Sequence, residues 1–317
     1  MQTALILGSN GQDGSYLADV LLERGWTVVG AALQETSRWV SHPRFHHRQT
    51  DVGNEGELTE LLKKTRPLRI FAMSAIHGAA GFEYESRFRS ALDVNVGSVH
   101  TCLEYLRRED LNARLFIASS MKVFGDNPPT VIDETTERRP TCLYGVTKNT
   151  AIELAQYYRR RHGVWASIGY LFNHDSPRRP PDYFLPRLAA QVAARVRGEP
   201  PPPPLNSLDF WCDWGSSLEF MGLAADMTEL EEQVDLILAS GRSHHAGDLA
   251  LLLCQAAGVD ASGFATGGDV RTDGLQGPPF RVSVERLSQL LGKPENDAFD
   301  VAAWILRERH GIALQRP

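Results

Sequence analysis

The segment Ala4-Leu5-Ile6-Leu7-Gly8-Ser9-Asn10-Gly11-Gln12-Asp13-Gly14-Ser15-Tyr16-Leu17 decides the fold of this chain. A short apolar run ends in three glycines, and an amphipathic segment follows from Leu17 to Leu22, which predicts a strand, a tight turn and a helix. Glycine has no Cβ, so a turn built from it lets a ligand approach the backbone. A helix that begins there directs free N–H groups and its positive dipole end toward an anion, and the expected anion is the pyrophosphate of a dinucleotide.

The spacing of the three glycines is Gly-x-x-Gly-x-x-Gly, over Gly8, Gly11 and Gly14. The commonest dinucleotide fingerprint has Gly-x-Gly-x-x-Gly instead. A strand-to-helix turn without a ligand is the alternative. The dinucleotide interpretation is favoured because the glycines directly follow an N-terminal strand, which is the position that the binding mechanism requires.

Composition excludes several classes of protein. The chain has 317 residues, 42% of them hydrophobic, and a net charge of -6, so it can bury a large core but is a poor partner for nucleic acid. Four cysteines without a CxxC motif argue against a disulfide framework and a zinc site. No apolar run is as long as a membrane span, and the N-terminus enters a strand too early for a signal peptide. We therefore expect a cytoplasmic protein without a metal.

Strands and helices alternate through the first half of the chain. The predicted strands are 27–33, 69–73, 114–118 and 165–171, and the predicted helices are 55–64, 91–107 and 146–160. This alternation predicts an α/β fold with a doubly wound, parallel Rossmann-type sheet. Ligands of such sheets bind beyond the carboxyl ends of the strands. The residues expected to face one crevice are Gly8, those after Met73, Ser119, Ser120 and Asn173.

The pattern changes after Leu171. Prolines cluster over 177–186, and five more occupy 200–204, where they exclude a helix or a central strand. A helix is predicted between them, over 185–197. We predict a dinucleotide-binding domain over 1–171 and a smaller substrate-binding domain over 172–317, of which 205–245 may return to the sheet. The Gly- and Asp-rich segment 267–277 is predicted to be an exposed loop.

Tyr144 and Lys148 stand four residues apart at the start of a predicted helix, so they share one face. An ammonium beside a phenol stabilises the phenolate and is expected to lower the pKa of the tyrosine toward the working pH. Such a phenolate can take a proton from a sugar hydroxyl while a nicotinamide takes the hydride. The same spacing occurs on exposed helices, but Ser119 and Ser120 favour catalysis, because they follow the strand 114–118 at the end of the sheet that carries the glycine turn. Loop capping is the alternative for the two serines.

The glycine pattern, a serine at the end of a strand and Tyr-x-x-x-Lys resemble the extended short-chain dehydrogenases/reductases. Within that superfamily (NAD-dependent epimerases/dehydratases) the chain is most similar to GDP-mannose 4,6-dehydratases. GSNGQDGSYL at 8–17 is close to their opening motif, and LFNHDSPRR at 171–179 is close to their Phe-Asn-His-Glu-Ser-Pro-Arg-Arg segment. Asp213-Trp214-Gly215 and Glu134-Thr135-Thr136 match two further motifs. The resemblance covers about residues 1–245.

The resemblance implies a nicotinamide cofactor, a nucleotide-diphosphate hexose as substrate, and a homodimer or homotetramer. It implies catalysis by Ser120, Tyr144 and Lys148. Substrate contacts are implied for Ser119, Asn173 and Arg178. The implied cofactor contacts, with the pyrophosphate on the glycines and the adenine at Asp51, are Gly8, Asn10, Gly11, Gln12, Asp13, Gly14, Arg38, Asp51, Tyr144, Lys148 and Arg179. Arg178 and Arg179 support the cofactor site or an interface between subunits.

The family reaction is an internal redox cycle. It implies that Tyr144 deprotonates the C4 hydroxyl as the C4 hydride leaves, that the acidified C5 proton and the C6 hydroxyl are then lost, and that the hydride returns to C6. Lys122 departs from the family, which has a glutamate there as the C5 base. A cationic lysine cannot accept a proton, and as an ammonium it suits ketone reduction better than elimination. A solvated loop lysine is the alternative.

Two further departures concern the ligands. Residues 32–34 carry neither the arginines of the family nor an acidic residue, so Arg38 is the candidate for a 2′-phosphate and NADP is preferred to NAD. A surface arginine is the alternative. Cys212 replaces an arginine that contacts the diphosphate, which leaves the nucleotide open. Among weaker candidates, His77 is expected to be a hydrogen-bonded structural residue, Trp211 and Trp214 are expected in the core or on a lid, and the pairs at 46–47 and 244–245 are expected on a polar surface.

Three functional hypotheses follow. The first is a nucleotide-sugar dehydratase like the GDP-mannose 4,6-dehydratases. The second, based on Lys122, which is then a catalytic candidate itself, is a 4-keto reductase or an epimerase without elimination. The third is a dinucleotide-binding sensor without catalysis, against which Tyr144 and Lys148 argue.

Overall fold

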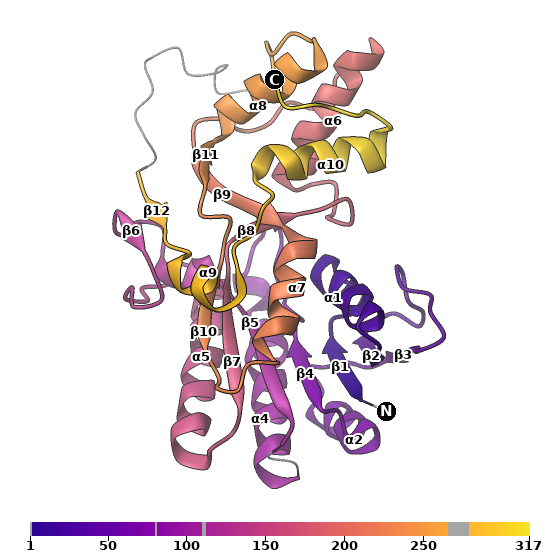
Figure 1. Ribbon diagram of the computed structural model, residues 1–317, viewed down its shortest axis with the longest axis vertical. Helices are drawn as coiled ribbons and strands as arrows, with labels where there is room; N and C mark the ends of the chain where they lie inside the picture. Colours follow the sequence, from indigo (N-terminus) through magenta and orange to yellow (C-terminus); the bar gives the residue numbers. More distant parts are fainter. Residues whose placement is uncertain (1, 80, 110–111, 266–278) are drawn as a thin grey trace.

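The computed structural model describes residues 2–79, 81–109, 112–265 and 279–317. Its centre is a seven-stranded sheet in the order β10-β7-β5-β4-β1-β2-β3, in which all neighbouring strands are parallel (Figure 1). The strands of this sheet are β1 (Thr3–Leu7), β2 (Thr27–Ala32), β3 (Phe45–Gln49), β4 (Arg69–Ala72), β5 (Arg114–Ser120), β7 (Ala166–Leu171) and β10 (Asp235–Leu238). The predicted α/β fold with a parallel Rossmann-type sheet is confirmed.

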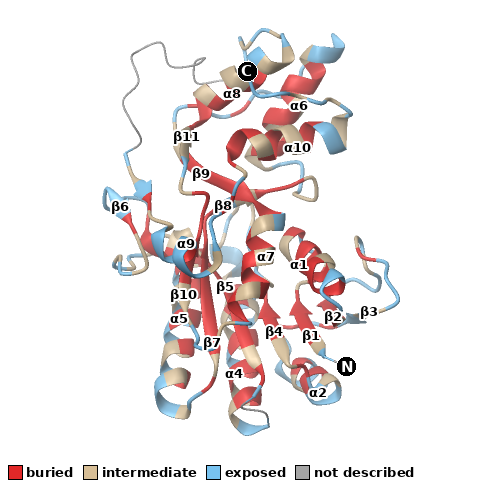
Figure 2. Cartoon of the chain, in the orientation of Figure 1, coloured by how far each residue is buried: buried red, intermediate tan, exposed pale blue. Residues whose placement is uncertain are grey.

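Helices cover both faces of the sheet. Because strand side chains alternate, Leu5 and Leu7 pack into a core with α2, α4 and α5, whereas Ala4 and Ile6 pack into a second core with α1, α7 and Leu287 of α9. Figure 2 shows the inner strands of the large sheet as buried and the edge strand β3 as largely exposed. The bounds of these helices are α1 (Gln12–Glu23), α2 (Glu55–Thr65), α4 (Ser98–Arg108), α5 (Leu143–His162), α7 (Ser217–Met227) and α9 (Glu285–Leu291). The fold is therefore doubly wound.

The strand order reverses beside β1. The chain runs from β1 outward to β2 and β3, and then returns to β4 on the other side of β1 and continues outward to β5, β7 and β10. The connections that leave β1 and β4 therefore diverge, and in open α/β sheets a ligand crevice lies at such a point.

Elements from the second half of the chain form a smaller layer beyond the carboxyl ends of the strands (upper part of Figure 1). A three-stranded sheet in the order β11-β9-β8 packs there with three helices around a third core. The elements are β8 (Asn173–Asp175), β9 (Trp211–Ser216), β11 (Ser243–His245), α6 (Phe184–Arg197), α8 (Ala246–Ala257) and α10 (Ala298–His310). β10 lies within 205–245 and belongs to the large sheet, next to β7. The domain boundary after residue 171 stays a prediction, and the predicted loop 267–277 lies outside the described residues.

Several local features differ from the sequence expectation. The helix predicted over 91–107 consists of α3 (Phe88–Leu92), a π-helical turn over Asp93–Gly97, and α4. α5 begins at Leu143, so Tyr144 and Lys148 lie in its first turns. β3 is an exposed, polar edge strand without an apolar pattern.

The minor elements are the 3₁₀ turns Glu85–Arg87 and Met121–Phe124 and the parallel pair of β6 (Val131–Ile132) and β12 (Arg281–Val282). Among the described helices, none combines the length and apolarity needed to cross a membrane.

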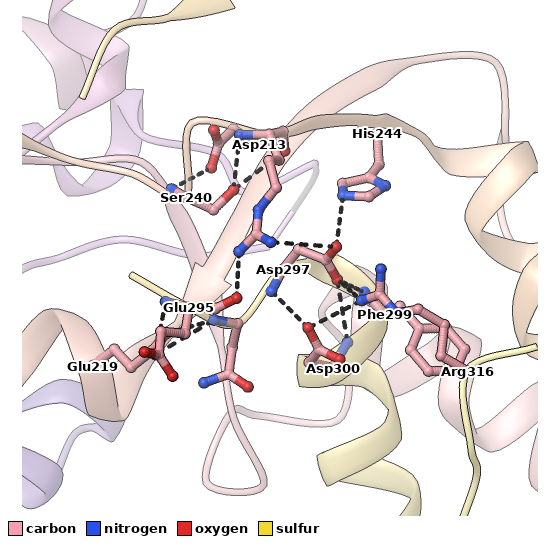
Figure 3. A network of polar contacts seen from close by, with 11 residues as sticks. Asp213, Glu219, Ser240, His244, Glu295, Asp297, Phe299, Asp300 and Arg316 are labelled. Carbon is pink, nitrogen blue, oxygen red and sulfur yellow. Dashed lines mark hydrogen bonds and ion pairs between the residues drawn. The ribbon is translucent and has the colours of Figure 1, made fainter. Parts of the chain in front are cut away.

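A buried carboxylate holds the C-terminal residues on the smaller layer (Figure 3). Asp297 caps the N-terminus of α10, accepting from the backbone N–H of Phe299 at 2.9 Å, and only 3% of its side chain is exposed. Arg316 lies 2.5 Å from it and His244 lies 3.6 Å from it. Burial alone would raise the pKa of Asp297, but its contacts with His244 and Arg316 hold that pKa well below the usual range. His244 is thus a partner of a buried charge, and His245 behind it is itself buried, so the expectation of a polar surface at 244–245 is wrong.

Replacing Asp297 by alanine should lower the free energy of unfolding by about 3 kcal/mol at neutral pH, because the helix cap is lost and Arg316 loses a buried carboxylate partner. A carboxylate with a depressed pKa stabilises the fold above its ordinary pKa, and this contribution is lost as the pH falls. Urea unfolding should therefore show the difference between wild type and Asp297→Ala shrinking from about pH 5 downward. Glu308→Ala, which removes an exposed ion pair with Arg307, is the control and should change stability by less than about 1 kcal/mol. Equal effects of the two variants would contradict the account.

Candidate active site

A cavity of about 770 Å³ lies at the carboxyl ends of β1, β4, β5 and β7 and against the first turn of α1. It includes the residues that the sequence places after four separate strands, so the prediction of one shared crevice is confirmed. The predicted site residues that line it are Gly8, Asn10, Gly11, Gln12, Asp13, Gly14, Arg38, Asp51, Ser119, Ser120, Tyr144, Lys148, Asn173 and Arg179. Lys122 and Arg178 are not among the lining residues.

The glycine turn brings backbone to the surface of the cavity. Gly8 has a φ of +88°, in the region that favours glycine, and a Cβ on Gly14 would lie 2.3 Å from the carbonyl oxygen of Gly8. Only glycine therefore lets α1 begin this close to β1. The first N–H groups of α1 have no partner within the helix and lie at the cavity wall. This cradle suits the pyrophosphate of a dinucleotide.

Asn10 connects the glycine turn to the loop after β2. Its Nδ2 donates to Gln34 Oε1 and to the carbonyl oxygen of Thr36, both at 3.0 Å, and its Oδ1 accepts from the backbone N–H of Arg38 at 3.0 Å. The Arg38 guanidinium lies 4.7 Å from the centre of the Trp39 ring. Asn10 therefore holds the backbone of Arg38 at the rim of the cavity. The Arg38 side chain, which we predict to bind a 2′-phosphate, also lines the cavity. Asp51, at the same end, accepts from the N–H of Gly53 at 2.9 Å.

A buried ion pair joins the glycine turn to β8. Asp13 Oδ2 lies 2.9 Å from His174 Nε2, and the other ring nitrogen of His174 is 2.6 Å from the carbonyl oxygen of Phe172, so both nitrogens face acceptors. Burial would raise the pKa of Asp13 and lower that of His174, but the attraction between them lowers the pKa of Asp13 and raises that of His174. Gln12 Oε1 accepts from Ser176 at 2.7 Å on the same side. The side chains of Gln12 and Asp13 thus brace the turn, and a direct cofactor contact by either stays a prediction.

Tyr144, Lys148 and Ser120 meet at the floor of the cavity. Lys148 Nζ lies 5.7 Å from the centre of the Tyr144 ring and donates to the carbonyl oxygen of Ala118 at 2.9 Å. The Ser120 side chain lies close enough to Tyr144 to oppose, in part, the rise in the pKa of the phenol. Burial lowers the pKa of Lys148 to about 8 and raises the pKa of Tyr144 well above its ordinary value. The spacing-based grouping of these side chains is therefore observed, although their catalytic roles stay a prediction.

The pKa of Tyr144 differs from the sequence expectation. Lys148 was expected to lower it toward the working pH, but the ammonium is turned to Ala118 and burial of the phenol dominates. In the protein alone the phenol therefore keeps its proton, and a phenol that keeps its proton is equipped to donate it.

Two candidates for substrate contacts lie above this floor. Ser119 is buried and lines the cavity, and its Oγ has no hydrogen-bond partner among the described residues. An unpaired buried hydroxyl is costly, so a ligand oxygen is the natural partner. Asn173 donates to Cys212 Sγ at 2.6 Å, and burial raises the pKa of Cys212, so this thiol is neutral and offers a phosphate no charge.

Lys122 does not line the cavity. Its Nζ lies 3.1 Å from Asp126 Oδ1, and 44% of its side chain is exposed. Asp126 also accepts from Thr141 at 2.6 Å, and its pKa is lowered by these hydrogen bonds to Thr141 and Lys122. Lys122 and Asp126 form an ion pair at the surface. A group that could take a proton from C5 does not occupy this position.

The two arginines of the 171–179 segment have different surroundings. Arg178 pairs with Asp19 at 2.7 Å and lies 4.1 Å from the centre of the Tyr16 ring, behind α1. Arg179 lines the cavity, 3.0 Å from Asp175 and 3.7 Å from the centre of the Tyr183 ring. Contacts of Arg178 with substrate and of Arg179 with cofactor stay predictions.

Sequence reasoning missed two residues that support the site. Asn95 is buried in the π-helical turn, where its Oδ1 accepts from the N–H of Ile76 at 2.8 Å and its Nδ2 donates to Thr147 Oγ1 at 3.0 Å. Tyr84 hydrogen-bonds His77, which itself lines the cavity. The sequence offered one signal for Asn95, which is a polar residue on the buried face of a predicted amphipathic helix. In the structure this residue lies in a π-helical turn, and such turns often occur at functional sites. Trp214 packs in the third core, which is one of the two positions expected for it, the core or a lid.

Comparisons with known proteins find relatives over most of the chain. A family model described as GDP-mannose 4,6 dehydratase matches residues 5–271. GDP-mannose 4,6-dehydratase from Yersinia enterocolitica is 28% identical over 275 residues, which cover 82% of this chain and 73% of that protein.

Solved structures share the fold. UDP-glucose 4-epimerase from Thermotoga maritima superimposes with a TM-score of 0.80 at 17% identity, over 96% of this chain and 98% of the other. dTDP-glucose 4,6-dehydratase from Bacillus anthracis, solved in complex with NAD, superimposes with a TM-score of 0.79 at 16% identity, over 97% of this chain and 96% of the other. These likenesses concern the fold, whereas the family model covers most of the sequence. The chain belongs to the GDP-mannose 4,6-dehydratase family of nucleotide-sugar enzymes.

Proposed function

We propose that this protein is an NAD(P)-dependent enzyme whose chemistry on a nucleotide-linked hexose is confined to C4, and that it acts as a 4-keto reductase. The observation that carries the proposal is the Lys122–Asp126 ion pair, which stands where the family resemblance implies a glutamate that removes the C5 proton. A lysine held as an ammonium by a carboxylate cannot accept that proton. Oxidation or reduction at C4 needs no such base.

The floor of the cavity suits proton donation to a ketone. Tyr144 retains its proton because burial raises its pKa, so it can donate that proton to the C4 oxygen as the carbonyl is reduced. Ser120 and the unpaired hydroxyl of Ser119 can orient the same oxygen. Lys148 lies beside the phenol, and its pKa of about 8 suits return of a proton from solvent.

The nicotinamide dinucleotide supplies the hydride when it is bound. The residues that would hold it are the backbone of the glycine turn, with Gly8 and Gly14 at the pyrophosphate, Arg38 and Asp51 at the adenosine end, and Tyr144 and Lys148 at the nicotinamide end. The glycine cradle, which a Cβ on Gly14 would fill, supports this fit.

Dehydration is the second candidate, and family membership favours it, since the matching relatives are named GDP-mannose 4,6-dehydratases. An enzyme of this kind recycles its nicotinamide, whereas a reductase consumes one NADPH in each turnover. The test follows NADPH absorbance while purified protein is incubated with a nucleotide-linked 4-ketohexose. Sustained, substrate-dependent loss of absorbance supports the reductase. Absence of NADPH use, with water lost from a nucleotide hexose, supports the dehydratase.

Arg38 allows a prediction about the choice of cofactor. Replacing Arg38 by alanine should weaken binding of NADPH about tenfold and leave binding of NADH nearly unchanged, because only NADPH carries the 2′-phosphate and an exposed charge-assisted contact is worth about 1–2 kcal/mol. Fluorescence titration of both cofactors measures this. Arg48→Ala, on the exposed edge strand β3, is the control. An equal loss of affinity for both cofactors would refute the assignment of Arg38.

A further inference from the structure

We infer that His77 is a positioning residue for Tyr144: its ring lies on the face of the phenol and, with Tyr84, fixes the direction in which the phenol oxygen points. The inference rests on the proposed function only in that Tyr144 is taken as the proton donor. It adds a residue that the Ser120, Tyr144 and Lys148 set does not contain.

The geometry of the three rings carries the inference. The His77 and Tyr144 rings are stacked, with centres 4.4 Å apart and planes 25° apart. The centre of the Tyr84 ring lies 6.0 Å from the centre of the Tyr144 ring, and the two rings are nearly parallel. His77 Nδ1 lies 2.6 Å from Tyr84 Oη, so a hydrogen bond sets the rotation of the imidazole. A ring held by a hydrogen bond on one side and by stacking on the other can restrain the neighbouring phenol.

The backbone beneath the stack is also tied to the helix of Tyr144. Asn95 accepts from the N–H of Ile76, next to His77, and donates to Thr147 Oγ1, which in turn donates to the carbonyl oxygen of Tyr144 at 2.8 Å. One buried amide therefore connects the loop that carries His77 to the first turn of α5. The two stacked rings consequently sit on backbones that are fixed relative to each other.

The surroundings keep His77 from serving as a charged group. Although the residue is exposed at the cavity, desolvation by the surrounding side chains and the neighbouring cations Arg179, Lys148, Lys122 and His174 lower the pKa of His77 to about 4, so the ring is neutral at physiological pH. A neutral ring adds no charge beside the phenol, and its effect on Tyr144 is one of orientation.

The test compares three variants with a matched control. His77→Asn removes the ring, His77→Phe keeps a ring but loses the hydrogen bond, and Tyr84→Phe loses the same hydrogen bond from the other side. His100→Asn is the control, because it removes a similar contact, His100 Nε2 with Tyr158 Oη at 3.2 Å, between α4 and α5. Two readouts are taken: steady-state kinetics of ketone reduction, and fluorine NMR of protein labelled with fluorotyrosine, in which Tyr144→Phe identifies the Tyr144 resonance.

We expect His77→Asn to lower kcat about 10²-fold with KM within about twofold, because misplacing a catalytic group by about 1 Å has an effect of that size. We expect His77→Phe and Tyr84→Phe to show equal, smaller losses, and the double variant to lose no more than either, since both remove one hydrogen bond. The Tyr144 fluorine resonance should shift in His77→Asn and stay in place in His100→Asn. A change in KM alone, or an unmoved resonance in His77→Asn, would overturn the inference. The NMR readout needs no turnover, so it stands even if reduction of a 4-ketohexose is not observed.

Discussion

Tyr144→Phe should lower kcat for the C4 reaction by about 10³-fold, within the range of about 10² to 10⁴ that a positioned acid or base contributes. The phenol is buried beside Lys148 and close to the Ser120 side chain, and no other described tyrosine combines these contacts. The substitution removes only the hydroxyl and keeps the ring and its packing, so the fold and the binding of cofactor should be preserved. Steady-state kinetics, with cofactor titration by fluorescence, measures both.

Tyr183→Phe is the matched control. Tyr183 also lines the cavity, but it lies against Arg179 and has no contact with Lys148. Its substitution should lower kcat by less than about tenfold. If Tyr144→Phe kept the wild-type rate, Tyr144 would not be the proton donor. The sensor hypothesis, or another route for the proton, would then be favoured.

Gly14→Ala should abolish cofactor binding and lower the free energy of unfolding by about 3 kcal/mol, at the upper end of what overpacking usually costs. The added Cβ would lie 2.3 Å from the carbonyl oxygen and 2.9 Å from the carbonyl carbon of Gly8, and both are backbone atoms that no side-chain rotation can move. The turn must therefore open, and the N–H groups at the start of α1 leave their places. Urea unfolding and NADPH titration check the two effects.

Gly11→Ala supplies the comparison within the same turn. Its Cβ would meet only the carbonyl oxygen of Gly8, at 3.3 Å, and its φ of -72° is one that alanine adopts readily. We expect a stability change of at most about 1 kcal/mol and measurable cofactor binding. Equal losses from the two substitutions would mean that the close approach of α1 to β1 is not what the turn depends on.

The parts of the molecule that the sequence predicts are those with local causes. β1, the glycine turn and α1 follow from one apolar run, three glycines and one amphipathic segment. The grouping of Tyr144 and Lys148 follows from helical spacing, and the shared crevice follows from the ends of parallel strands. β3 was not predicted, because an edge strand without an apolar face has no hydrophobic periodicity.

The remaining features depend on contacts between distant residues. His77 and Tyr144 are 67 positions apart in the chain yet stacked, and no spacing rule connects them. The pKa of Tyr144 could not be predicted from its neighbour Lys148 because burial, which only the fold decides, has the larger effect. Lys122 was recognised as a departure, but its partner Asp126 was not, since the pairing depends on the 3₁₀ turn over Met121–Phe124.

Mass spectrometry of the products tests the central claim, that the chemistry is confined to C4, most directly. Purified protein would be incubated with GDP-mannose, a small panel of other nucleotide hexoses and a nucleotide-linked 4-ketohexose, each with and without NADPH. The account predicts that no hexose loses water and that the ketohexose gains two hydrogens when NADPH is present. Loss of one water from any hexose without net use of NADPH would contradict it, and would require a residue other than Lys122 to remove the C5 proton.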